Sequence, residues 1–356
     1  MCHILFLKKT LYLCVQSIKK STCLPAFFQS LKNSKLNFLI KVVEVAMLAW
    51  VIERQVAGRD HADELWHVFV QNINGKDIWW LSLAILLMPF NWALETQKWR
   101  QLTREFEPTS FWKAYRAIFA GVLFSVFTPN RVGEYGGRIL WVSRENQWKA
   151  VIATMVGSFS QLLVIITLGL AGLLFFAYRF VVTDFFVLQI VGFLGVVLIL
   201  LLLFIFYNID LCVPLAKRIP GIRYAKPLLK HLVILTHYSS SELSQAIFIA
   251  LIRYLLYTAQ YFCMLQFFDI ETSFSASLAC IATIFLLQTS VPLPPVMGMF
   301  ARGEVALYVW GFFSRDEMSI LASSFGLWII NVIVPAFIGL IFVVSTNLLK
   351  PFGYEK

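Results

Sequence analysis

The sequence is poor in charged residues. Only 14% of its 356 residues are Asp, Glu, Lys or Arg and 59% are hydrophobic, whereas about a quarter of a soluble domain is charged. The run 319–349 has no charged residue, 181–207 has only Asp184, and 147–178 has only Lys149. Each run exceeds the roughly 20 residues that a helix needs to cross a bilayer. Because the runs lack the alternation of barrel strands, the sequence predicts an all-α, polytopic membrane protein.

The sequence also lacks the short motifs of nucleotide-using and hydrolytic enzymes. It contains no Walker A sequence, no GxSxG and no dinucleotide-binding fingerprint on a strand. Its six cysteines show no CxxC and no paired spacing, so they indicate neither a disulfide framework nor a metal centre. We predict no cofactor and no metal, and we leave the question of catalysis open, with the balance against an enzyme.

The net charge of +10 comes from basic loops and does not indicate nucleic-acid binding. Lys and Arg lie in short loops between hydrophobic runs, including a basic loop at 208–244, as in the cytoplasmic loops of membrane proteins. We therefore predict a multi-pass protein of the cell (inner, cytoplasmic) membrane with both termini cytoplasmic. The expected partners are membrane lipids with anionic head groups, with no nucleic acid. A homo-oligomer or a complex with a membrane enzyme is also compatible with the sequence.

Residues 1–35 differ from the rest of the chain. They carry six lysines and no acid, and they lack the small-residue cleavage site of a signal peptide. Two interpretations remain: a basic cytoplasmic lead-in, or a start codon assigned too far upstream. Residues 36–356 are predicted to form a single transmembrane domain.

Six segments are predicted to cross the membrane. They are 37–52, 78–94, 149–178, 184–207, 245–268 and 319–349. The loop at 53–77 has five acids and three basic residues, so we place it outside.

Two further apolar segments, 111–127 and 273–291, each run into a polar break that contains Pro and Gly. Loop charges place cytoplasm on both flanks of the first and exterior on both flanks of the second, which predicts two oppositely facing re-entrant hairpins. The spans around them form two triplets of inverted topology, an inverted-repeat plan common in transporters. The alternative is eight plain spans with two proline kinks.

Ionisable residues at these breaks are candidates for function, because a charge at membrane depth costs at least about 2.5 kcal/mol. An Arg fork can hold a phosphate, and Glu can receive an ammonium group or a proton. The predicted substrate-binding residues are Arg131, Glu134, Arg138, Arg302 and Glu304, with Asn91, Glu95 and Gln161 as weaker candidates. The alternative role is an internal Arg–Glu pair that holds each hairpin together. Lys98 is interpreted as an ordinary interfacial anchor.

The two breaks resemble motifs of a known family. The segment 129–138 reads Pro-Asn-Arg-Val-Gly-Glu-Tyr-Gly-Gly-Arg and is similar to the Pro-x-Arg-x-Gly-Glu motif of the membrane region of lysylphosphatidylglycerol synthases, which are flippase-like membrane proteins. Their later Pro-x-Pro-Gly-Gly motif is matched less closely at 292–298, where the paired glycines are missing and Glu304 is displaced. The resemblance covers about residues 36–350.

This resemblance implies a membrane unit that binds or translocates lipid. In two-part members, a C-terminal aminoacyltransferase domain makes lysyl-phosphatidylglycerol and the membrane region flips it outward. This sequence ends at Lys356, so we expect a stand-alone bacterial unit without that domain. The predicted function is a flippase or transporter for a phospholipid or related phosphate-bearing lipid. The alternatives are a membrane-embedded enzyme or accessory factor for polyprenyl-phosphate or glycolipid, with Glu134 as general base, and a structural partner of a membrane enzyme.

Overall fold

The computed structural model describes residues 62–73, 75, 77–126, 128, 131–181, 184–211, 214, 233–290 and 298–345. The predicted first span at 37–52, the lead-in at 1–35, most of the basic loop at 208–244, and the prolines of both breaks lie outside these residues. The described part of the chain is helical and contains no strand.

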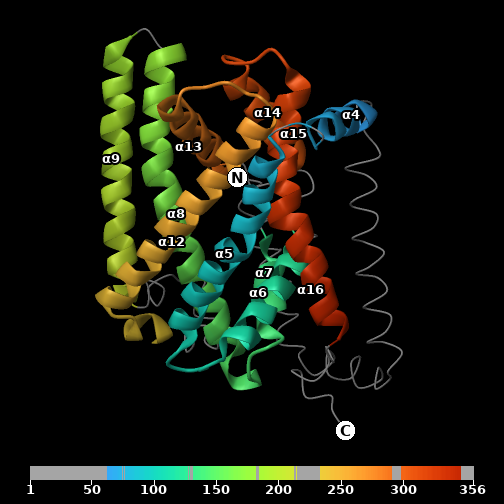
Figure 1. The fold of residues 1–356 in the computed structure, drawn as a ribbon. Coiled ribbons are helices and arrows are strands. Elements are labelled where there is room, and N and C mark those ends of the chain that lie inside the picture. Colours follow the sequence, from blue (N-terminus) through green and yellow to red (C-terminus); the bar gives the residue numbers. More distant parts are fainter. Residues whose placement is uncertain are drawn as a thin grey trace, which may run out of the picture.

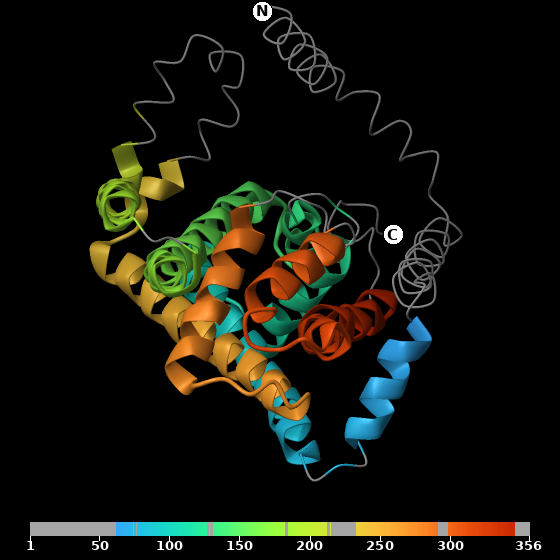
Figure 2. The ribbon, with the colours of Figure 1, turned by 90° about the horizontal axis from the view of Figure 1, so that it is seen from above.

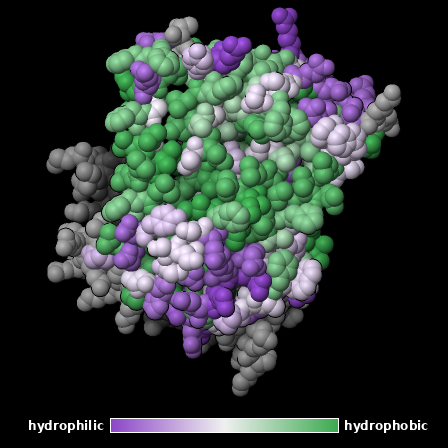
Figure 3. Space-filling view, turned by 60° about the vertical axis from the view of Figure 1, so that its left-hand side comes forward, coloured by the Kyte–Doolittle hydropathy of each residue, from purple (hydrophilic) through white to green (hydrophobic). Residues whose placement is uncertain are grey.

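Five helical segments are long and apolar enough to cross a membrane, and they confirm five of the predicted spans (Figure 1). They are α5 (Ile78–Thr103), α8 (Gln147–Phe176), α9 (Phe185–Tyr207), α12 (Ser240–Phe267), and the continuous run of α15 (Glu317–Trp328), η8 (Ile329–Ile333) and α16 (Val334–Val344). The short turns are η3 (Arg144–Asn146), η4 (Ala177–Val181), η5 (Ile209–Leu211) and η7 (Val233–His237). On the face shown in Figure 3, a hydrophobic band crosses the middle of the molecule, with hydrophilic residues above and below it.

Side-chain caps fix where several of these helices begin. Asp184 accepts a hydrogen bond from the backbone of Phe186 at the start of α9. Ser239 and Glu242 form a reciprocal capping box at the start of α12. Such caps satisfy backbone N–H groups that a helix leaves unpaired at its first turn.

The first hairpin consists of α6 (Phe111–Val126) and α7 (Gly133–Ile139), which pack against each other in opposite directions. Their backbones approach so closely that a Cβ on Gly137 would lie 2.5 Å from the carbonyl oxygen of Ala120. A Cβ on Gly133 would collide with the carbonyl of Phe124. Glycine is therefore required at this interface, because any side chain would push the two helices apart.

The second hairpin consists of α13 (Phe274–Ser290) and α14 (Gly298–Trp310), which also run in opposite directions. Its outer ends lie at the top of the molecule in Figure 1, whereas those of the first hairpin lie at the bottom. The two hairpins thus face opposite ends of the helix bundle. That each re-enters the membrane from one side remains a prediction.

The two triplets, α5–α6/α7–α8 and α12–α13/α14–α15/α16, pack reciprocally. α5 contacts α12, while α6 packs on α16 and α13 packs on α8. Glycines permit close approach at both reciprocal interfaces, with Gly339 of α16 against the Phe119 carbonyl and Gly169 of α8 against α13. Gly169 and Gly339 occupy the same position relative to the first residues of α8 and α15, respectively. This reciprocity is what an inverted repeat would produce.

Two peripheral helices frame this bundle. α4 (Ala62–Ile73) lies in the segment that was predicted as an exterior loop; these residues form a helix and not a loop, and their exterior placement stays a prediction. Phe69 of α4 packs edge-on against Phe267 with ring centroids 6.0 Å apart, and such apolar contacts hold α4 against the core. α9 stands at the edge of the bundle beside α8 (Figure 2), and almost all of its surface is exposed, as expected of a lipid-facing helix.

Candidate functional site

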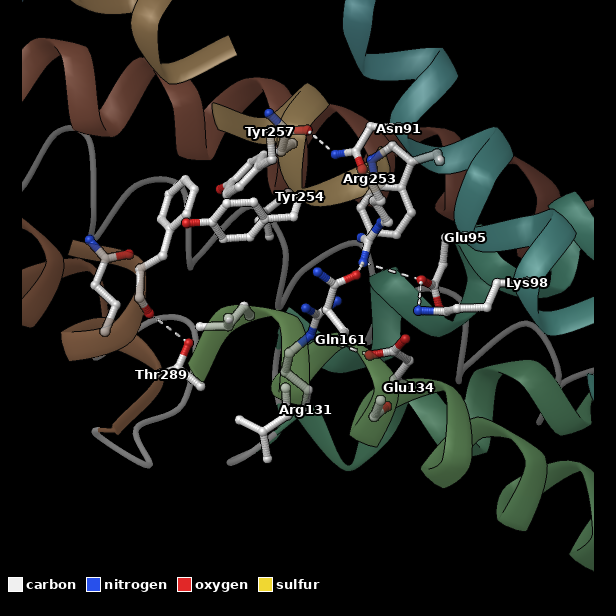
Figure 4. A pocket seen from close by; sticks show the side chains of 18 of the residues that line it. Asn91, Glu95, Lys98, Arg131, Glu134, Gln161, Arg253, Tyr254, Tyr257 and Thr289 are labelled. Atoms are coloured by element: carbon white, nitrogen blue, oxygen red, sulfur yellow. Dashed lines mark hydrogen bonds and ion pairs between the residues drawn. The ribbon is translucent and has the colours of Figure 1, made fainter. Parts of the chain in front are cut away.

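A cavity of about 480 Å³ lies between the two triplets. Helices α5, α8 and α12, the residues of both hairpins, and η8 contribute to its wall (Figure 4). Six of the eight predicted site residues line it: Asn91, Glu95, Arg131, Glu134, Gln161 and Arg302. The cavity thus brings together polar groups from segments that are far apart in the sequence.

Glu95 is the centre of the charged network. Its carboxylate is almost fully buried and lies 2.9 Å from Lys98 Nζ, 2.9 Å from Arg138 Nη2 and 3.2 Å from Arg253 Nη1. These partners come from α5 itself, from the first hairpin and from α12. Buried charges persist when they are paired and hydrogen-bonded, so Glu95 holds three parts of the fold together.

Arg253 connects the second triplet to this network. Its Nη1 also donates to Gln161 Oε1 at 3.3 Å, and its guanidinium lies 5.2 Å from the ring centroid of Trp92 (Figure 4). A basic residue inside the hydrophobic run of α12 is unusual, and on this ground the sequence offered Arg253 as a weaker candidate that could pair with the second hairpin. Its partners could not be read from the sequence because they lie on α5 and α8.

The first hairpin supplies Arg131, Glu134 and Arg138. Arg131 Nε lies 3.3 Å from Glu134 Oε2, while Arg138 Nη2 pairs with Glu134 Oε1 as well as with Glu95. Arg131 has a φ of 57°, an uncommon backbone conformation for a non-glycine residue. Arg138 is buried behind the cavity wall and does not line the cavity. It therefore orients the two carboxylates.

The second hairpin supplies one charged side chain to the described cavity wall, that of Arg302. Arg302 is half-buried and lines the cavity, whereas Glu304 is exposed and does not. Residues two apart on a helix point to different sides, so the two side chains of α14 cannot both face the cavity. The structure thus does not bring Glu304 to the predicted site.

The structure shows that the interpretation of Lys98 as an interfacial anchor is wrong. Its side chain is only 1% exposed and lines the cavity wall. The predicted span ended at residue 94, but α5 continues to Thr103, and Lys98 therefore remains inside the bundle. Gly157 of α8 lies against it, since a Cβ there would be in van der Waals contact with Lys98 Cε at 3.5 Å.

Amide side chains complete the site. Asn91 donates to Asn331 Oδ1 at 3.0 Å and so joins α5 to η8. Gln161 and Asn331 are separated by the same sequence interval as Gly169 and Gly339, and both line the cavity. Corresponding positions of the two triplets thus contribute to one site.

The chemistry of the site favours an anion. Both oxygens of Glu134 are engaged by arginines, and Glu95 is shared among three cations. Arg302 has no acidic partner among the described residues. Guanidinium groups donate several hydrogen bonds in a fixed geometry suited to phosphate.

Comparison with known proteins agrees with this arrangement. A search of curated proteins finds no match to the chain. Residues 38–339, which include every residue of the cavity, match the family described as the lysylphosphatidylglycerol synthase TM region. The match covers most of the chain and confirms the resemblance seen at the two breaks. This multi-pass membrane protein therefore belongs to the lysylphosphatidylglycerol synthase TM region family.

Proposed function

We propose that this protein binds the head group of a phosphate-bearing lipid in its cavity and moves that lipid between membrane leaflets. The observation that carries the proposal is Arg302, which has no acidic partner among the described residues and lines the same cavity as Arg131, Arg253 and Lys98. A water-filled pore would not need this concentration of cationic donors, whereas a phosphate would bind to them.

The arrangement of the hairpins supports a transport role. Inverted repeats with broken helices commonly place the substrate site where the repeats meet, and the cavity lies between the two reciprocally packed triplets. The acyl chains would stay in the lipid that borders the hydrophobic band (Figure 3).

The membrane-enzyme alternative has less support. It needs Glu134 as a general base, but Arg131 and Arg138 occupy the two carboxylate oxygens and stabilise the carboxylate anion, which makes it a weaker base. A general base needs a free oxygen within reach of the proton that it abstracts. The site is thus better suited to holding a substrate than to deprotonating one.

We also propose that the end of the bundle with the first hairpin faces the cytoplasm. That end carries most of the described basic residues outside the cavity, whereas the opposite end has Arg179 and Arg315. The basic residues at the first end are Arg100, Arg104, Lys113, Arg116, Arg144 and Lys149. Cytoplasmic loops are enriched in Lys and Arg, which gives the orientation.

Transport is tested in proteoliposomes that contain phosphatidylglycerol or phosphatidate with a fluorophore on one acyl chain. Chemical quenching of the outer leaflet reports how fast labelled lipid moves between leaflets. We expect the protein to raise this rate above that of protein-free vesicles, and Arg131→Gln and Arg302→Gln to lower it about tenfold, the effect of losing one charge-assisted contact.

Arg315→Gln is the matched control, because Arg315 is exposed and lies outside the cavity. It should move lipid at the wild-type rate. Equal rates with and without protein would refute the transport proposal. Recovery of a chemically altered lipid from the vesicles would instead favour the enzyme alternative.

A further inference from the structure

The cavity holds more positive than negative charge. Four basic side chains and two carboxylates line it, and one further arginine lies directly behind and pairs with both carboxylates. Five cations and two carboxylates leave an excess of three positive charges. The seven residues are Lys98, Arg131, Arg138, Arg253, Arg302, Glu95 and Glu134.

Changes of protonation do not remove this excess. Arginine keeps its charge in proteins, so four guanidinium groups face two carboxylates even if Lys98 is neutral. Protonation of either glutamate would increase the excess further. Unpaired charge is costly inside a membrane protein, and a bound anion is the direct means of balancing it.

The described residues that line the cavity include no acid besides Glu95 and Glu134. The segments 127–130 and 291–297, which connect the arms of the two hairpins, contain no Asp or Glu. Glu304 is exposed and is not part of the cavity wall. Among the described residues near the cavity, the remaining negative charge must therefore come from the ligand.

We infer that the ligand's head group ends in a phosphomonoester or diphosphate, which can carry two or more negative charges, and not in a singly charged phosphodiester. This inference rests on the proposed function and narrows its substrate. With Lys98 neutral, the cavity has an excess of two positive charges. A phosphodiester such as phosphatidylglycerol would leave at least one of them unbalanced, whereas a doubly charged phosphomonoester would balance both.

The placement of the guanidinium groups agrees with this ligand. Arg131, Arg253 and Arg302 reach one cavity from the first hairpin, α12 and the second hairpin. Arg253 Nε is buried without a hydrogen-bond partner, and neither Arg131 nor Arg302 has its terminal nitrogens engaged within the described part of the chain. A phosphomonoester presents three terminal oxygens to such donors, while a phosphodiester presents two.

The same charge argues against an aminoacylated lipid. The lysyl ester of phosphatidylglycerol carries two ammonium groups and one phosphate, so its head group is positive overall. Adding it would increase the positive charge of the cavity, and like charges at close range repel. Membership of the family therefore does not by itself assign lysyl-phosphatidylglycerol to this protein.

Binding is measured by calorimetric titration of the purified full-length protein in a non-ionic detergent. The titrants are phosphatidate, phosphatidylglycerol, lysyl-phosphatidylglycerol and phosphatidylcholine with identical acyl chains, and inorganic phosphate. At pH 7.5 we expect phosphatidate to bind at least about tenfold more tightly than phosphatidylglycerol, one charge-assisted contact being worth about that factor. Near pH 5 the preference should shrink, because a phosphomonoester regains its second proton near pH 6.

The Arg302→Gln variant should lose the preference for phosphatidate over phosphatidylglycerol, and the Arg315→Gln variant should keep it. Equal affinity for phosphatidate and phosphatidylglycerol, or tighter binding of the lysyl ester, would overturn the inference and leave the proposed function intact. Inorganic phosphate that binds as tightly as phosphatidate would support the phosphomonoester chemistry and assign it to a free ion, against a lipid function. Binding of none of these ligands would refute both.

Discussion

Arg253 of α12 places Nη1 3.2 Å from Oε2 of Glu95 on α5, and this contact joins the two triplets inside the cavity. Glu95 has two further cationic partners, Lys98 and Arg138. One carboxylate thus balances charges that come from three separate helices.

Replacing Glu95 by Gln should strongly destabilise the protein. The substitution leaves three buried cations without their shared carboxylate, and breaking a buried charge pair costs about 3–5 kcal/mol. Thermal unfolding in detergent, followed by the loss of monodisperse protein, measures the effect. Glu304→Gln is the control, because Glu304 is exposed and should change stability by less than about 0.5 kcal/mol. Equal melting temperatures for the two variants would contradict the central role of Glu95.

Adjacent glycines of α7 should respond in opposite ways to alanine. A Cβ on Gly137 would lie 2.5 Å from backbone atoms of α6, whereas nothing lies within 4 Å of a Cβ on Gly136. Gly137→Ala should therefore destabilise by about 1–3 kcal/mol through overpacking. Gly136→Ala should be neutral or stabilise by up to about 1 kcal/mol, because Ala is the better helix former. Similar melting temperatures for both variants would show that α6 and α7 do not pack in this way.

Cysteine labelling tests the orientation in the membrane. Arg144→Cys and Arg315→Cys place exposed thiols at opposite ends of the bundle. We expect a membrane-impermeant maleimide to label position 315 in intact cells and position 144 only after the membrane is opened. The background protein has serine at the four cysteines outside the described residues, while the buried Cys263 and Cys280 can remain. Labelling of both positions from one side would refute the topology.

Glu107 should make stability depend on pH. Burial alone would raise the pKa of this carboxyl, but hydrogen bonds from Ser143 and Asn146 and the charge of Lys113 outweigh it and hold the pKa below its ordinary value. The folded-state pKa is thus the lower one. The stability that Glu107 contributes is present above its unfolded-state pKa of about 4.3 and is lost as the pH falls through the folded-state pKa.

Glu107→Gln should therefore lower the melting temperature at pH 7, by an amount that corresponds to about 1–2 kcal/mol for hydrogen bonds to a charged group. The difference in melting temperature between the variant and the wild type should disappear below about pH 4. Melting curves of both proteins at pH 7 and at low pH check this. A difference that stays constant with pH would mean that the loop contact does not depend on the ionised carboxylate.

Much of the helical framework could be predicted from the sequence. α9 was predicted almost to the residue because its hydrophobic run is nearly uninterrupted. The end of α5 was missed, because Glu95, Lys98 and the residues that follow are polar and are buried only by packing against other helices. α4 was missed because its apolar run is too short to cross a membrane, and its role becomes visible only when it packs against the core.

The candidate site could be predicted in part. Charges inside or beside hydrophobic runs are unusual, and this signal identified Arg131, Glu134 and Arg302, which the structure brings to one cavity. The pairing of Arg253 with Glu95 could not be predicted, because it depends on how α5 and α12 pack. Glu304 was predicted on the same ground as Arg302, as a charge at the second break, but the helical turn of α14 directs it elsewhere.

The uneven division of charge between the triplets has a consequence for biosynthesis. The N-terminal triplet supplies both carboxylates of the cavity, and the C-terminal triplet brings Arg253 and Arg302 with no carboxylate of its own to the cavity wall. While it is being made, the C-terminal triplet must therefore insert two unneutralised arginines unless the N-terminal triplet is already folded beside it. Because the N-terminal triplet is synthesised first, its carboxylates can be in place to neutralise the arginines of the C-terminal triplet as that triplet inserts.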